Sequence, residues 1–231
     1  MNDELYAPNG NILRELTALR EAFRLPRFWL QTRHKLPRGQ RRVLVIPGFG
    51  TGDGSTLVLR ATLRSLGYDV HGWGLGRNGG QVEQLLPRVA EVVRTAAVDG
   101  PVHLVGWSLG GYLAREVARD NPEHVRQVIT LASPIIGGPK YTAAARYYRD
   151  RGVDLDAIEA KIEARNATPL RVPILALYSE RDNVVCPGAC IDHHNPEVDH
   201  VRVNDCEHAS FGFNPGVLGI VAERLATMAH L

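Results

Sequence analysis

Cysteine is scarce in this chain, whose 231 residues contain only Cys186, Cys190 and Cys206. So few cysteines argue against a disulfide-held secreted scaffold and make reduced thiols the default. Because the three cluster in the last quarter, a single disulfide such as Cys190 to Cys206 stays open. A metal site is not expected, since C-x₃-C followed by His193 and His194 is an unusual spacing for zinc.

An excess of charge of one sign and long apolar runs are also missing. The 27 basic and 25 acidic residues are interspersed and leave a net charge of +2, which gives no electrostatic reason to expect nucleic acid as a partner. No apolar run approaches the roughly 20 residues that span a bilayer. The first residues lack the pattern of a secretory signal. We therefore expect a cytoplasmic protein without stable membrane insertion.

The length suits a single domain, residues 1–231, that can bury a core of its own. Residues 1–42 are expected to form an N-terminal helix and a basic linker. Residues 11–24 place Ile12, Leu16, Leu19 and Phe23 on one helical face, which predicts a helix that docks on the domain and ends at Pro26. A membrane-surface or partner helix is the alternative. The basic stretch 33–42 reads as a solvated linker rather than a phosphate- or membrane-binding patch.

Short apolar runs alternate with helical patterns along the rest of the chain. Strands are expected at 43–46, 69–73, 102–105, 128–132, 174–178 and 198–203, and helices at 55–66, 81–97, 109–120 and 217–228. This alternation predicts an α/β fold with a mainly parallel sheet covered by helices on both faces. In such sheets functional residues lie where the strands end in loops.

The strongest motif is G-x-S-x-G at residues 106–110, centred on Ser108. It stands where a predicted strand ends and a helix begins, which is the context that a nucleophilic serine on a tight turn requires. Gly106 and Gly110 are expected because side chains there would collide with neighbouring backbone. The helix that follows points its positive end at the serine and favours developing negative charge.

Attack by the serine creates an oxyanion that needs hydrogen-bond donors. The glycine-rich loop 47–50 follows the first strand, so the backbone N–H groups of Phe49 and of Leu109 are the expected pair. A dinucleotide-binding loop is the rival interpretation of these glycines. The pattern G-x-G-x-x-G is not satisfied, because Asp53 stands where the third glycine belongs.

Ser108 also needs a general base and a carboxylate that orients it. In serine hydrolases with this kind of turn, the acid and then the histidine follow the serine in the chain. Asp182 follows the predicted strand 174–178 and is favoured as the acid over Glu180 and Asp205. His208, in the loop before the last helix, is favoured as the base. The other histidines after Asp182 are His193, His194, His200 and His230.

These residues together resemble the α/β-hydrolase family from residue 43 onward. The resemblance rests on Pro47-Gly48-Phe49-Gly50, the serine motif, Asp182 and His208. More narrowly, the segments 67–78 (GYDVHGWGLGRN) and 178–182 (YSERD) resemble small bacterial esterases or lipase-like hydrolases. The family implies cleavage of small-molecule carboxylic esters through an acyl-enzyme, without a cofactor. Pro47 departs from the His-Gly common in lipases, which argues against a triglyceride lipase.

The segment 134–172 is too long for a simple connection and is expected to form a small helical lid. Helices are predicted at 141–151 and 155–165. Trp107, Ile135 and Tyr141 are the candidates for lining an acyl pocket. Further lid residues that could face the pocket are Tyr147, Tyr148, Leu155, Ile158 and Ile162, unless they only pack the helices together.

The sequence is compatible with three functions. The first is a serine esterase acting on apolar acyl esters, and the second is a thioesterase or acyltransferase that uses the same acyl-enzyme. The third is a binding protein that keeps the fold without catalysis, although such a protein has no need of Ser108, Asp182 and His208. The natural substrate and the oligomeric state cannot be read from the sequence.

Overall fold

The computed structural model describes residues 5–10, 15 and 18–227. In this part of the chain six strands form one sheet, with every neighbouring pair parallel and in the order β2-β1-β3-β4-β5-β6. The strands are β1 (Arg42–Ile46), β2 (Asp69–Gly72), β3 (Val102–Trp107), β4 (Val125–Leu131), β5 (Ile174–Tyr178) and β6 (Asp199–Arg202). The helices are α2 (Leu19–Arg27), α3 (Leu57–Ser65), α4 (Val82–Ala96), α5 (Leu109–Asp120), α6 (Ala145–Arg149), α7 (Leu155–Asn166) and α8 (Pro215–Thr227).

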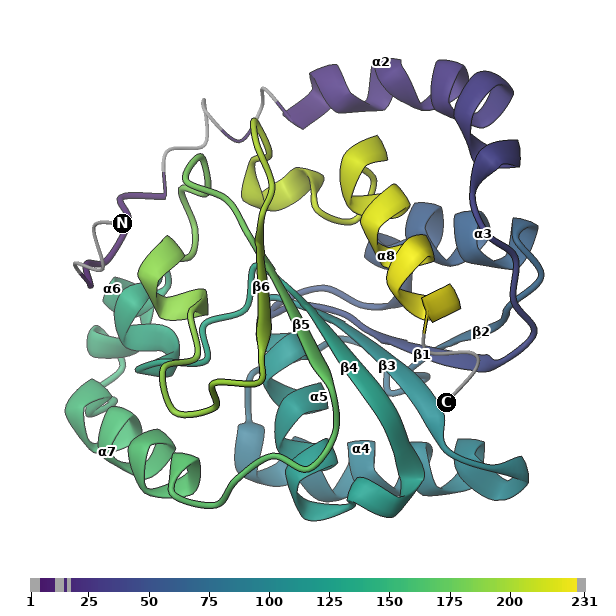
Figure 1. Cartoon of the computed structure of the whole chain (residues 1–231). Coiled ribbons are helices and arrows are strands. Elements are labelled where there is room, and N and C mark those ends of the chain that lie inside the picture. The colour runs from purple at the N-terminus through teal and green to yellow at the C-terminus, as the bar shows by residue number, and fades with distance from the viewer. Residues whose placement is uncertain (1–4, 11–14, 16–17, 228–231) are drawn as a thin grey trace.

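Helices cover both faces of the sheet, as Figure 1 shows. On one face, apolar side chains of α3 and α8 pack with β1 and β4 into one core cluster. On the other face, α4 and α5 pack against β1 and β3 in a second cluster. Strands buried from both sides explain the nearly continuous apolar runs in the sequence. The predicted fold class, a parallel sheet covered by helices on both faces, is confirmed.

The N-terminal helix differs from the prediction. α2 runs on through Pro26 and is followed by a π-helical turn, Phe28–Thr32. Phe23 is 84% exposed, so its expected contact with the domain is wrong, whereas Ala18, Glu21 and Phe28 are buried. The buried face of α2 is thus not the face that the apolar spacing indicated. Glu21 lies on the buried face and makes hydrogen bonds with Arg24 and Asn214. Ile12 and Leu16 lie outside the described residues.

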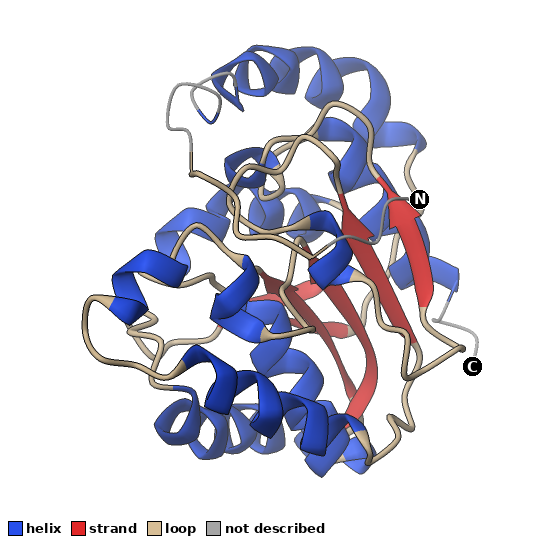
Figure 2. Ribbon diagram, turned by 90° about the vertical axis from the view of Figure 1, so that its left-hand side faces the viewer, coloured by secondary structure: helices blue, strands red, loops and turns tan. Residues whose placement is uncertain are grey.

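The connection between β4 and β5 contains two helices, α6 and α7, which lie to one side of the sheet (Figures 1 and 2). We call the segment 134–172 the cap. Helix α7 begins where the Asp154 carboxylate accepts the backbone N–H groups of Asp156 and Ala157, each at 3.0 Å. Helix α6 is shorter than predicted, because Thr142 is extended and its hydroxyl accepts the N–H of Ala144. Within the described residues, no helix has the length and apolarity needed to cross a bilayer.

Candidate active site

Ser108 lies between the end of β3 and the start of α5. Its backbone has φ 54° and ψ −126°, a conformation that costs a non-glycine residue free energy and that is typical of functional turns. The turn is held in place because the N–H of Ser108 donates to the carbonyl of Leu131 at 2.7 Å and its own carbonyl accepts from Gly111 at 2.9 Å. The serine therefore stands at the N-terminus of a twelve-residue helix, as the motif predicted.

The glycines of the motif are required by close backbone approach. A β-carbon on Gly106 would lie 2.3 Å from the carbonyl oxygen of Gly110, and one on Gly110 would lie 2.3 Å from that of Ile46. Neither obstacle is a flexible side chain that could move aside. Helix α5 is thereby allowed to start directly against β1 and β3, which brings Ser108 to the same edge as the loop after β1.

Asp182 follows β5 and is almost fully buried, with 4% of its surface exposed. Its Oδ1 accepts the N–H groups of Val184 at 2.8 Å and of Val185 at 2.7 Å. Its Oδ2 lies 2.7 Å from Nδ1 of His208. Since a carboxylate only accepts hydrogen bonds, the imidazole carries its proton on Nδ1 and leaves the lone pair of Nε2 available.

His208 opens a short 3₁₀ turn, His208–Ser210, before α8. Its ring centroid lies 6.1 Å from that of Trp107, the residue before Ser108. Burial disfavours the charged imidazolium, but the charge of Asp182, the hydrogen bond to it and the charge of Glu15 outweigh burial. The pKa of His208 is therefore raised above its ordinary value.

The competing residues point elsewhere. Glu180 is exposed and pairs with Arg202 at 2.8 Å, and Asp205 is exposed and pairs with Arg181 at 3.0 Å. His200 is engaged on β6, where its Nε2 accepts the N–H of Asp192 at 2.9 Å. Among the candidates that the structure describes, the geometry joins Asp182 to His208 alone, and His230 lies outside the described residues.

The loop after β1 reaches the serine from the other side. A β-carbon on Gly48 would come within 3.1 Å of the Ser108 β-carbon, so backbone faces Ser108 there. Within the described chain, no hydrogen bond engages the N–H of Phe49 or that of Leu109. Both residues line the same cavity as Ser108. These N–H groups are thus free to donate hydrogen bonds to an anionic oxygen.

A residue to which the sequence assigned no role holds this loop in place. Asn78 is fully buried, and its Nδ2 donates to the carbonyl of Pro47 at 2.9 Å. Its backbone carbonyl accepts the N–H of Gly50 and its N–H donates to the carbonyl of Thr51, each at 2.8 Å. Arg77 adds a bond from Nε to the carbonyl of Gly50 at 2.8 Å. The stretch 77–78 belongs to the motif that resembles small esterases, but spacing alone does not reveal its contacts.

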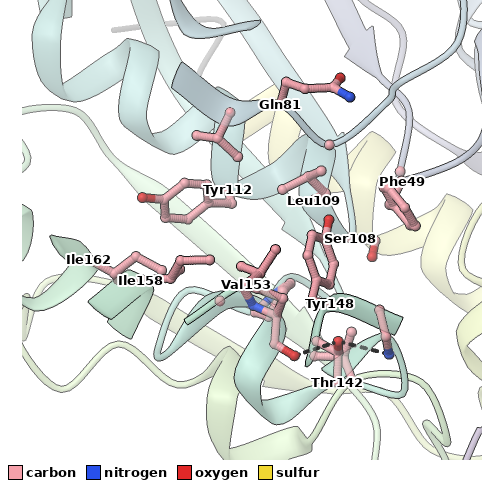
Figure 3. Close-up of a pocket in the computed structure, with 18 of the residues that line it drawn as sticks. Phe49, Gln81, Ser108, Leu109, Tyr112, Thr142, Tyr148, Val153, Ile158 and Ile162 are labelled. Carbon is pink, nitrogen blue, oxygen red and sulfur yellow. Dashed lines mark hydrogen bonds between the residues drawn. The ribbon is translucent and has the colours of Figure 1, made fainter. Parts of the chain in front are cut away.

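A cavity of about 990 Å³ opens above Ser108 and is lined mostly by apolar side chains. Figure 3 shows Leu109 and Tyr112 on its α5 side, facing Val153, Ile158 and Ile162 across the space. Trp107, His208 and the cap residue Tyr148 also line it, and the ring of Phe49 lies 5.9 Å from that of Tyr148.

Two residues expected to line the pocket lie outside its lining. The hydroxyl of Tyr141 donates to Glu159 of α7 at 2.6 Å, which turns the ring into the cap. Ile135 is buried at the start of the cap, and its N–H donates to the carbonyl of Ala189 at 2.9 Å. Tyr141 thus joins two parts of the cap and Ile135 ties the cap to the turn Pro187–Cys190, while Tyr148, Ile158 and Ile162 line the cavity instead.

Comparison with solved structures decides the fold family. A lipolytic enzyme from the study of the metagenome-derived LipS and LipT superposes with a TM-score of 0.65 at 19% identity, covering 85% of this chain and 96% of that one. The monoacylglycerol lipase of Paleococcus ferrophilus gives 0.62 at 14% identity, covering 83% and 97%. The chain has the α/β-hydrolase fold. In an α/β hydrolase, a strained serine after a central strand, a late acid and a final histidine stand in the order found here.

Sequence comparisons agree with this α/β-hydrolase assignment. Residues 68–172 match the family model described as a thioesterase domain. A pimeloyl-[acyl-carrier protein] methyl ester esterase of Aeromonas hydrophila is 43% identical over 65 residues, which are 28% of this chain and 25% of the relative. The protein of the same name from Vibrio vulnificus is 30% identical over 139 residues, covering 48% and 47%. The chain thus matches a quarter to about half the length of these relatives.

Proposed function

We propose that the protein hydrolyses carboxylic esters through an acyl-enzyme on Ser108. His208 Nε2 takes the proton of the Ser108 hydroxyl as Oγ attacks the ester carbonyl, and returns it to the leaving alcohol. Asp182 holds the imidazole in the productive tautomer and stabilises its cation. The N–H groups of Phe49 and Leu109 bind the oxyanion. A water molecule, activated by His208, then attacks the acyl-enzyme and releases the acid.

One observation carries this proposal. One apolar cavity is bordered by the strained Ser108, by His208, which pairs with Asp182 at 2.7 Å, and by two N–H groups that have no partner among the described residues. A binding protein of this fold would have no need of a buried carboxylate–imidazole pair beside a strained serine, since both cost free energy. The names of the curated relatives agree with ester hydrolysis.

The cavity indicates the class of substrate. Its walls are mainly aliphatic and aromatic, so an apolar acyl chain fits better than a charged or sugar-like group. The named relatives act on the methyl ester of a pimeloyl group held by an acyl-carrier protein. We therefore propose small esters of medium-length acyl chains, with the chain lying between α5 and α7.

A thioesterase is the second candidate. The match of residues 68–172 to the thioesterase-domain family favours it, and the same acyl-enzyme serves both reactions. An acyltransferase would differ only in the acceptor that replaces water. Ester hydrolysis and thioester hydrolysis are distinguished by comparing kcat/KM for an ester and a thioester of the same acyl group.

Labelling and turnover test the proposal together. A fluorophosphonate probe should label the wild type and not Ser108→Ala, and p-nitrophenyl butyrate should be hydrolysed only by the wild type. His208→Ala should lose about as much activity as Ser108→Ala, because members of a triad act as a unit. Labelling that persists in a folded Ser108→Ala variant would place the nucleophile elsewhere.

We also infer a cytoplasmic location. Cys190 and Cys206 are buried thiols, and the disulfide between them left open by the sequence is not formed. Reduced cysteines are typical of a reducing compartment. Fractionation of producing cells should recover the protein with cytoplasmic markers.

A further inference from the structure

Three described residues before β1, Tyr6, Gly10 and Glu15, lie against the two loops that carry Asp182 and His208. The N–H of Gly10 donates to the carbonyl of Asn183 at 3.1 Å, next to Asp182. Tyr6 is close enough to Asp182 and Cys186 that their charges, after burial as the larger cause, raise the pKa of its phenol. These contacts place Tyr6 and Gly10 beside the loop that carries Asp182.

Glu15 makes the most specific of these contacts. Its Oε2 accepts the backbone N–H of Ala209 at 2.9 Å, and Ala209 directly follows His208 in the turn His208–Ser210. Its Oε1 is buried and has no hydrogen-bond partner among the described residues. A carboxylate oxygen withdrawn from water without a partner costs free energy, so a compensating role is expected.

The compensating charge can come from His208. The charged groups that act on this imidazole are Asp182, from the loop after β5, and Glu15, from the N-terminal segment. Trp107, packed on the ring from the end of β3, carries no charge. Glu207 precedes His208 in the chain and is buried. When His208 is protonated, its positive charge and the negative charge of Glu15 attract each other.

We propose that Glu15 is a positioning residue of this site, which fixes the His208 turn through Ala209 and stabilises the imidazolium formed during catalysis. The inference rests on the proposed function. In the proposed reaction the proton moves from Ser108 Oγ to His208 Nε2 and on to the leaving alcohol, so Glu15 itself neither takes nor gives a proton. Its charge lowers the free energy of the intermediate in which the imidazole carries two protons.

Glu15→Gln separates charge from hydrogen bonding. The amide oxygen can still accept the N–H of Ala209, while the negative charge is lost. We expect the plateau of kcat/KM to fall about threefold to tenfold. We also expect the acid limb of the pH profile to move to lower pH, because one of the two charges that raise the pKa of His208 is gone.

Glu21→Gln is the matched control. Glu21 is a buried acid of the same N-terminal segment. Its Oε2 accepts from Asn214 at 3.1 Å, and its Oε1 pairs with Arg24 at 2.9 Å. Its charge is not among those that act on His208. This variant should leave the acid limb where it is in the wild type, even if the protein becomes less stable.

A titration of the His208 imidazole by NMR gives a readout that does not need turnover. It should report a lower pKa in Glu15→Gln than in the wild type, with no change in Glu21→Gln. An unchanged pKa and an unchanged acid limb in a folded Glu15→Gln variant would overturn the inference, as would an equal shift in the control. If the wild type neither hydrolyses esters nor reacts with fluorophosphonate, the proposed function fails, and a shifted titration would still support the contact between charges.

Discussion

Gly48 and Ser108 approach each other so closely that a β-carbon on Gly48 would lie 3.1 Å from that of Ser108 and 3.3 Å from the carbonyl oxygen of Trp107. Two loops from different strands therefore meet backbone to backbone at Ser108. The φ of Gly48 is not in the left-handed region, so the glycine is needed for space and not for conformation. The position of the N–H of Phe49, a proposed oxyanion donor, depends on this approach.

Gly48→Ala should therefore damage catalysis more than stability. The added methyl group must push the loop back by a few tenths of an ångström, which moves the N–H of Phe49 away from the oxyanion. We expect kcat to fall about 10- to 100-fold, which is at most the fall that follows removal of one oxyanion donor. Gly54→Ala is the control, because nothing lies within 4 Å of its added β-carbon. Equal kcat values for the two variants would separate Gly48 from the oxyanion site.

Asp182→Asn should preserve the shape of the site but favour the wrong imidazole tautomer. The loss of turnover is expected to approach ~10⁴-fold, as for the equivalent change in a serine protease. Glu180→Gln, an exposed carboxylate on the same loop paired with Arg202, should change turnover little. Steady-state kinetics with one ester decide between them, and the reverse ranking would move the orienting role to Glu180.

The pH dependence of activity follows from the state of His208. Only the neutral imidazole accepts the serine proton, and although burial lowers its pKa, Asp182 and Glu15 raise it above the ordinary 6.5. We expect kcat/KM to fall as the pH decreases through a value above 6.5. A half-maximal point clearly below 6.5 would contradict the electrostatic environment described for His208.

Stability should change with pH in the opposite sense. A folded-state pKa raised above the unfolded value gives a contribution that is fully present below the unfolded pKa and is lost as the pH rises through the folded pKa. His208→Ala should therefore lose more of the free energy of unfolding at pH 5.5 than at pH 9. Urea denaturation at the two pH values measures this difference, and an equal loss at both would show that the shift is absent.

Ile162→Trp should shorten the acyl pocket. Ile162 faces the cavity from α7, away from Ser108 along the space between α5 and the cap (Figure 3). The larger side chain should reduce kcat/KM for p-nitrophenyl octanoate at least about tenfold and leave that for the acetate within about twofold. Ile162→Val, which keeps the fold and the space, should change neither. A matching loss for both esters in Ile162→Trp would mean that the acyl chain lies elsewhere.

Local sequence is enough to predict the strand, turn and helix around Ser108. It also predicts where along the chain the strands lie, because each strand is a short apolar run. About ten residues contain all the signals: a buried strand, a glycine on either side of the serine, and the start of a helix. The pairing of Asp182 with His208 was also predictable, because chain order and strand ends limit the choices. The predicted strand at 174–178 agrees with β5 at both ends.

Contacts between distant segments could not be predicted in this way. Asn78 holds the loop after β1 and Glu15 holds the turn of His208, and neither contact leaves a periodic signal in the sequence. Tyr141 was expected in the pocket because of its place in a helical pattern, but such spacing defines a face and not what the face meets. Phe23 shows the same limit, since the packed face of α2 includes the polar Glu21.

The bond between Glu15 and Ala209 joins residues 194 positions apart, and that between Glu21 and Asn214 joins residues 193 apart. On the ribosome, at about 5–20 residues per second, the N-terminal segment emerges roughly 10–40 s before its partners are made. The carboxylates of Glu15 and Glu21 then stay hydrated until residues 209 and 214 have been synthesised. A nascent chain that ends before residue 208 therefore carries Ser108 without its proposed base.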